Sequence, residues 1–193
     1  MNTSSSNTSN TVSHAVLSTR EMVLIALMAA ITCILGPFSL PIPFSPVPIT
    51  FTNLVIFLSL FVLGMKNGLI SYLIYFLLGL AGLPVFSGFS GGMGKVAGPT
   101  GGYLIGFFFL AVIAGLFIDH WHGKKYVAVI GMVLGMAVCY LFGTVWLARQ
   151  LGVSFIAGLS VGVIPYLPGD AVKIIIAIIV GPILRNSVRK LQN

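Results

Sequence analysis

The sequence predicts an all-α membrane protein, a six-transmembrane-helix bundle with Gly- and Pro-rich extracellular loops. Of its 193 residues, 58% are hydrophobic and only 7% are charged, and the mean hydropathy is +1.08. A water-soluble domain of this length carries far more polar surface. In lipid, backbone N–H and C=O groups must be hydrogen-bonded within the protein, either in helices or in a closed barrel. The apolar runs are long and lack the period-two alternation of barrel strands, so the sequence predicts helices.

Six apolar segments are candidates for the roughly 20-residue spans that a bilayer requires. The first three occupy residues 21–35, 50–65 and 68–80, and the second and third of these are short. The last three occupy residues 101–118, 126–148 and 161–184. Short polar connections, one around Lys66 and one across residues 119–125, join spans on the side that we interpret as cytoplasmic.

The net charge of +7 is distributed as a topology signal rather than as a surface for nucleic acid. If both termini are cytoplasmic, the outer loops carry only Lys95 and Arg149, whereas seven basic residues lie in inner segments, in agreement with the positive-inside rule. The seven are Arg20, Lys66, Lys124, Lys125, Arg185, Arg189 and Lys190. We therefore expect a multi-pass protein of the cell (plasma) membrane, with the lipid bilayer and not nucleic acid as its surroundings.

Residues 1–18 are rich in Ser, Asn and Thr, and we interpret them as a disordered cytoplasmic tail. Residues 19–193 then form a single six-helix transmembrane domain. Cys33 and Cys139 have no metal-ligand spacing. The sequence offers no paired carboxylates and no nucleophile with an evident base, so we expect neither enzymatic activity nor a metal or cofactor. It also lacks a phosphate-binding loop, so the chain alone cannot couple ATP hydrolysis to transport.

The loops on the outer side are long and irregular. Residues 36–48 and 81–99 are full of Gly and Pro, and the sixth span is interrupted on the same side by Pro165 and Pro168. Irregular backbone near membrane depth is tolerated where it is buried in protein or lines a cavity, and interrupted helices often mark binding sites in transporters. The sequence therefore predicts a pocket that opens outward.

Asp170 and Lys173 are charged residues that we expect within the membrane, beside this pocket. They lie three residues apart within the sixth span, so on a helix they share one face. Intramembrane charges are costly and usually face a cavity or each other. One interpretation is an internal salt bridge that closes a helix end; the other is a ligand site in which Asp170 accepts N–H donors and Lys173 pairs with an anionic group or neutralises Asp170. The two are compatible, because a pair formed without ligand could open to receive it.

The loop at residues 81–99 supplies further candidates for this pocket. Its glycines allow tight turns and close backbone approach to a small molecule, its aromatic residues can wall a ring system, and its lysine can attract a carboxylate. The alternative is a flexible linker with a solvated lysine. The candidate residues are Phe86, Ser87, Phe89, Gly91, Gly92 and Lys95.

Four motifs together resemble the biotin-specific S component of energy-coupling factor (ECF) transporters. They are SPVPIT at 45–50, GLPVFSGFSGG at 82–92, GPTGGYLIGF at 98–107 and PGDAVK at 168–173. The resemblance implies six transmembrane helices and an outward-facing biotin site that the first and third loops cap. It also implies assembly with a transmembrane coupling protein and two ABC ATPase subunits, the coupling protein being contacted by Ala26 and Ala30. The family pattern often has Gln where this chain has Thr52, which leaves a polar contact from the second helix in doubt.

The chemistry of biotin suits these residues. Asp170 would accept hydrogen bonds from the ureido ring, Lys173 would contact either the ureido carbonyl or the carboxylate, and Phe86, Phe89 and Tyr166 would wall the apolar rings. Biotin would be the transported ligand, with no cofactor. The alternatives are an S component for a different vitamin and a small ion channel, since Thr-Gly-Gly-Tyr at 100–103 faintly resembles a potassium filter.

Overall fold

The computed structural model describes residues 17–43, 45–120 and 124–190. The predicted tail therefore lies almost entirely outside the described residues. Helices dominate the described part, in agreement with the mainly helical membrane architecture that the sequence predicts. In chain order the elements are α1 (Thr19–Leu35), β1 (Ser39–Ile42), β2 (Ser45–Thr50), α2 (Thr52–Leu80), α3 (Met93–Ala97), α4 (Gly101–His120), α5 (Lys125–Leu151), α6 (Phe155–Gly162), the 3-10 turn η1 (Ile164–Tyr166) and α7 (Leu167–Lys190).

Among the described residues, four helical stretches are long and apolar enough to cross a membrane: Thr52–Leu80, Gly101–His120, Lys125–Leu151 and Phe155–Lys190. The segments predicted at 101–118 and 126–148 agree with α4 and α5 to within a few residues at each end. The first predicted segment, at 21–35, agrees with α1, whose N-terminus is closed by a capping box between Ser18 and Glu21.

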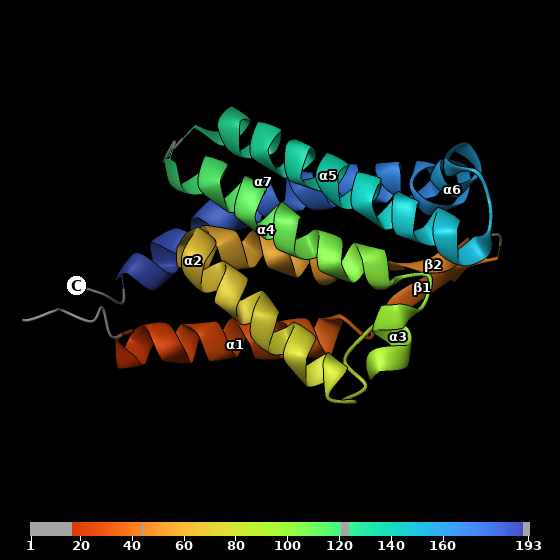
Figure 1. Cartoon of the computed structure of the whole chain (residues 1–193). Coiled ribbons are helices and arrows are strands. Elements are labelled where there is room, and N and C mark those ends of the chain that lie inside the picture. Colours follow the sequence, from red (N-terminus) through yellow and green to blue (C-terminus); the bar gives the residue numbers. More distant parts are fainter. Residues whose placement is uncertain (1–16, 44, 121–123, 191–193) are drawn as a thin grey trace, which may run out of the picture.

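The second and third predicted segments together correspond to α2, which is interrupted by a break. Gly64 has φ 77° and ψ 177°, which is outside the helical region, so the helix is broken two residues before Lys66, around which the connection was expected. The chain reverses at this break (Figure 1). The Asp119 carboxylate accepts a 2.7 Å hydrogen bond from the Met65 N–H. This bond caps the leg of α2 that follows the break, because the first N–H groups of a helix have no partner within it.

The first outer loop contains a β-hairpin that the sequence did not predict. β1 and β2 pair antiparallel, with Leu40 opposite Ile49 and an irregular register between Leu40 and Ile42. Proline cannot donate to a ladder, but in a two-stranded hairpin each strand has an unpaired edge that accommodates it. The prolines of this segment are therefore compatible with a hairpin, where an irregular loop was expected.

The sixth predicted segment is divided into α6, η1 and α7. α7 already begins at Leu167, so Pro168 lies in its first turn, where the missing proline N–H removes no helical hydrogen bond. Asp170 also lies in this first turn. Gly181 of α7 lies against the ring of Phe61 in α2, so the two helices approach closely.

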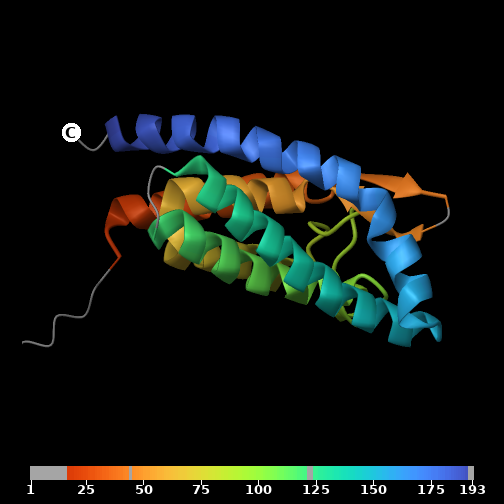
Figure 2. The same cartoon turned by 90° about the horizontal axis from the view of Figure 1, so that it is seen from above.

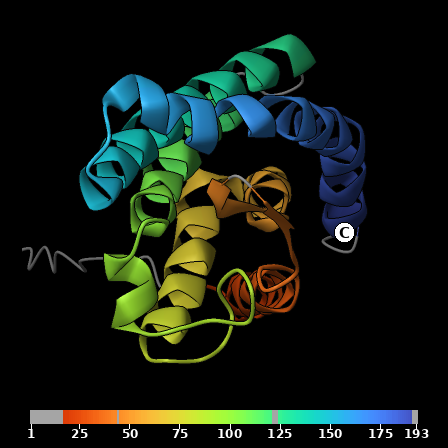
Figure 3. The same cartoon turned by 90° about the vertical axis from the view of Figure 1, so that its right-hand side faces the viewer.

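The helices run back and forth between two ends of the molecule. The start of α1 and the end of α7 lie at one end, whereas the hairpin, α3 and α6 gather at the opposite end (Figure 1). The view from above shows α7 extended along the bundle from the hairpin end to the C-terminal end (Figure 2). Seen end-on, the hairpin lies near the centre of a ring formed by the helices (Figure 3).

Candidate functional site

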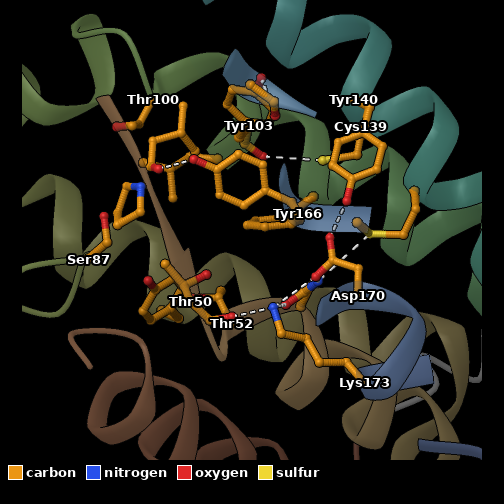
Figure 4. A pocket seen from close by; sticks show the side chains of 18 residues that line it. Thr50, Thr52, Ser87, Thr100, Tyr103, Cys139, Tyr140, Tyr166, Asp170 and Lys173 are labelled. Carbon is orange, nitrogen blue, oxygen red and sulfur yellow. Dashed lines mark hydrogen bonds and ion pairs between the residues drawn. The ribbon is translucent and has the colours of Figure 1, made fainter. Parts of the chain in front are cut away.

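A cavity lies between the hairpin and the helix ends that surround it. It has an empty volume of about 640 Å³, including the part open to solvent. Its lining comes from β2, α2, the 81–100 segment, α4, α5, α6, η1 and α7. Its lining includes Val47, Thr50, Thr52, Asn53, Ser87, Thr100, Tyr103, Met136, Tyr140, Tyr166, Asp170 and Lys173 (Figure 4).

Asp170 lies at one side of this cavity and accepts three hydrogen bonds. Its Oδ1 atom accepts from Asn53 Nδ2 and from Lys173 Nζ, both at 2.8 Å. Its Oδ2 atom accepts from the Tyr140 hydroxyl. Asp170 is 7% exposed, so these donors replace water around a nearly buried anion. One lone-pair position of Oδ2 remains for a further donor.

Lys173 uses its three N–H donors within the protein. Nζ donates to the Thr50 carbonyl at 2.6 Å, to Asn53 Oδ1 at 3.0 Å and to Asp170 Oδ1 at 2.8 Å. The residue is 8% exposed. A lysine ammonium carries three donors, so this cation is fully satisfied. The salt bridge considered from the sequence therefore forms, and it faces a cavity.

Asn53 bridges the two charged side chains. It was not among the site residues predicted from the sequence. Its amide nitrogen donates to Asp170 and its amide oxygen accepts from Lys173, while its side chain is almost completely buried. Thr52 stands where the family pattern often has Gln, which left a polar contact from the second helix in doubt. Asn53, one residue later, supplies a polar contact from this helix to the ion pair, and its signal in the sequence was an isolated amide in an apolar run. Tyr140 gave no comparable signal, because tyrosine is common in such helices.

Tyr166 connects the hairpin to the helices behind it. Its hydroxyl lies 2.7 Å from Ser45 Oγ and also contacts the Val47 carbonyl oxygen. Lys173 makes the second connection, through the Thr50 carbonyl at the end of β2. Both ends of β2 are thus held by side chains that line the cavity.

The residues predicted from the 81–99 loop differ in whether they line the cavity. Ser87 lines the cavity. Phe86 does not: it is fully buried and packs edge-on against Tyr75. Phe89 is 61% exposed, has a positive φ of 53° and contacts the Phe38 ring, so it lies outside the cavity lining.

Three further predicted residues of the loop also lie outside the cavity lining. Gly91 approaches the Leu83 carbonyl so closely that a side chain would not fit. Gly92, with φ 82°, precedes α3, and the half-exposed Lys95 lies within α3. Burial lowers the pKa of Lys95 from its usual value. Ala26 and Ala30 lie on the exposed face of α1.

Within the described part of the chain, no group of three or more His, Cys, Asp or Glu side chains could hold a metal ion. The cavity lining itself offers hydrogen bonding around one internal ion pair, with apolar and aromatic walls. Such a site is suited to a small molecule that has a donor-rich polar head and an apolar body.

Comparison with known proteins gives consistent matches. The model of the BioY family matches residues 5–190. A protein of Pyrococcus horikoshii named "Probable biotin transporter BioY" is 40% identical over 168 residues, covering 87% of this chain and 98% of that protein. A Rhizobium etli protein named "Biotin transporter BioY" is 39% identical over 176 residues, covering 86% and 92%.

A solved structure also matches. It is the crystal structure of the S-component for biotin from an ECF-type ABC transporter, which superposes with a TM-score of 0.80 at 31% sequence identity. The match covers 86% of this chain and 91% of that one.

Proposed function

The chain belongs to the BioY family, and from this premise we propose that it captures biotin at the outer membrane face, for uptake as the substrate-binding subunit of an ECF-type ABC transporter. The observation that carries the proposal is the cavity at the hairpin end, with the Asp170–Lys173 pair in its wall. The Oδ2 atom of Asp170 accepts an N–H of the ureido ring. Tyr166, Met136 and the hairpin contact the apolar part of the ligand.

The same proposal includes six membrane crossings with both termini cytoplasmic. α1, the two legs of α2, α4, α5 and the α6–α7 stretch would be the six. Three arguments support it: the reversal at Gly64, the position of the first and last helix ends at one side of the bundle (Figure 1), and the concentration of basic residues in the segments on that side.

The proposed partners are a transmembrane coupling protein and two ABC ATPase subunits. The chain has no phosphate-binding loop of its own, so the energy of ATP must come from other subunits. Ala26 and Ala30 are exposed on α1, and small residues four apart permit a close helix contact in lipid. They are the proposed docking residues.

Calorimetric titration of biotin into purified, ligand-free protein tests the function. We expect one binding site per chain, and we expect biotin to be the vitamin that mass spectrometry finds on the protein as purified from cells. Copurification of another vitamin, with no heat of biotin binding, would assign the chain to a different substrate. Ion flux through liposomes that contain this chain alone would indicate a channel.

Replacing Tyr166 by phenylalanine should make biotin dissociate faster. The change removes the hydroxyl that contacts Ser45 and Val47 but keeps the aromatic wall, so the hairpin loses one of its two connections. Because a hydrogen bond contributes about 1 kcal/mol, we expect the dissociation rate to rise by about fivefold. Stopped-flow displacement of a fluorescent biotin derivative measures it. Tyr126→Phe in α5, where the side chain is exposed, is the matched control, and equal rates in the two variants would contradict the expectation.

A further inference from the structure

Two side chains at the outer end of α5 donate hydrogen bonds to the end of α3. Trp146 Nε1 donates to the Gly98 carbonyl at 2.9 Å, and Gln150 Nε2 donates to the Ala97 carbonyl at 2.9 Å. We propose that Trp146 and Gln150 are positioning residues for biotin binding: they fix the α3–α4 junction, residues 97–102, and with it the cavity wall that follows this junction. The inference rests on the proposed function, because it concerns how the cavity is kept in shape for biotin.

α3 depends on an attachment of this kind, because it has little of its own to hold it in place. The helix has five residues, Met93–Ala97, and none of them is buried. A helix this short is marginal by itself, and the carbonyls of its last turn have no partner within the helix. Gln150 supplies a partner for the last carbonyl of α3, and Trp146 holds the C-cap residue Gly98. The two donors are four residues apart, so they lie on one face of α5 and reach neighbouring carbonyls together.

Trp146 also packs against the beginning of α4. A Cβ atom at Gly102 would lie 2.3 Å from the Trp146 Cβ atom, so α4 and α5 approach closely where α4 begins. Trp146 therefore contacts both sides of the junction, α3 through its indole N–H and α4 through Gly102. A shift of this side chain would move the end of one helix and the start of the next.

The start of α4 forms part of the cavity wall. Thr100, Tyr103 and Leu104 line the cavity. The Thr100 carbonyl accepts from the N–H groups of the other two, so the three residues are expected to move together. The Tyr103 hydroxyl donates to the Gly162 carbonyl of α6 at 3.0 Å. A displaced junction would therefore also disturb the side of the cavity that α6 forms.

α5 thereby connects two sides of the cavity. Tyr140, which precedes Trp146 on α5, lines the cavity, and its hydroxyl donates to Asp170 Oδ2. Thr100 and Asp170 lie on different sides of the cavity (Figure 4). A single helix thus holds the polar pair at one side and the α3–α4 junction at the other, and it sets the separation of the two walls.

Removing the two donors should make biotin dissociate faster from the full chain. Trp146→Phe removes the indole N–H and keeps an aromatic ring, and Gln150→Met removes the amide donor and keeps a side chain of similar length. We expect each change to raise the dissociation rate about three- to fivefold and the double variant to raise it about tenfold, as the loss of one and of two hydrogen bonds implies. Gln150→Lys restores a donor, so its rate should stay within about twofold of the wild-type rate. Stopped-flow displacement of a fluorescent biotin derivative measures the rates.

Arg149→Met is the matched control. It introduces the same residue one position before Gln150, at an exposed side chain that does not line the cavity, and it should leave the rate unchanged. If Trp146→Phe and Gln150→Met release biotin no faster than Arg149→Met does, the two residues do not position the site.

Hydrogen exchange separates positioning from a general loss of stability. In the Trp146→Phe and Gln150→Met variants, we expect faster amide exchange across residues 93–104, while the temperature of unfolding in detergent stays at the wild-type value. Faster exchange throughout the chain, together with a lower unfolding temperature, would overturn the proposal in favour of a purely structural role. A wild-type protein that binds no biotin would overturn the proposed function itself, and this role of the two residues with it.

Discussion

Replacing Lys173 by methionine should reduce biotin affinity by at least tenfold and also destabilise the protein. The substitution keeps an unbranched side chain of similar length but removes the cation beside the nearly buried Asp170 carboxylate. Removing one partner of a buried ion pair costs about 3–5 kcal/mol, because the other charge remains buried and unpaired. Calorimetry measures the affinity, and thermal unfolding in detergent measures the stability.

The loss of affinity follows from the position of the acceptor atoms. Lys173 and Asn53 together hold Asp170 Oδ1, which leaves Oδ2 directed to Tyr140 and the cavity. Without the ammonium, one of the hydrogen bonds that orient the carboxylate is lost, so Oδ2 is no longer held toward the cavity. The ureido N–H then lacks a well-placed acceptor.

A double variant separates the two effects of this substitution. Asp170→Asn combined with Lys173→Met removes both charges, and replacement of a whole buried pair is often neutral for stability. We therefore expect the melting temperature to recover toward that of the wild type while biotin binding stays weak. Lys190→Met, at the exposed end of the same helix, is the matched control and should change neither property. Wild-type affinity in Lys173→Met would remove the pair from the site.

The long apolar runs made α4 and α5 predictable, because their lengths and flanking charges agree with a membrane span. The pair at Asp170 and Lys173 was predictable for the same physical reason, since charges at that depth require a cavity or each other. The connection between the second and third spans was expected around Lys66, where the sequence is short and polar. The structure places it at Gly64, where backbone conformation and the cap from Asp119 decide.

The cavity wall was harder to predict from the sequence. Phe86 and Phe89 lie three residues apart in a glycine-rich loop, and both were expected to face the ligand. One is core and the other is exposed, because the positive φ of Phe89 and the Phe86–Ser90 bridge turn the two side chains in different directions. Asn53 was overlooked because only its spatial position between two charges distinguishes it from any other amide.

Replacing Gly101 by alanine should displace the junction between α3 and α4 and reduce biotin affinity about tenfold or more. A Cβ atom at Gly101 would overlap the Val96 carbonyl oxygen and lie 2.6 Å from the carbonyl carbon. These are backbone atoms, which cannot turn away as the end of a flexible side chain can. Thr100 is the preceding residue and lines the cavity, so a shift of the junction moves its hydroxyl. Overpacking of this kind typically costs about 1–3 kcal/mol.

Gly94→Ala is the matched control for this prediction. It lies seven residues earlier, within α3, and a Cβ atom there would meet nothing within 4 Å. The same chemical change should therefore leave biotin affinity unchanged and stabilise the protein by a few tenths of a kcal/mol at most, because alanine favours a helix more than glycine does. If Gly101→Ala binds biotin as Gly94→Ala does, the position of Thr100 is not set by the α3–α4 junction. A selective loss in Gly101→Ala means that the close backbone contact at Val96 holds this wall of the site in place.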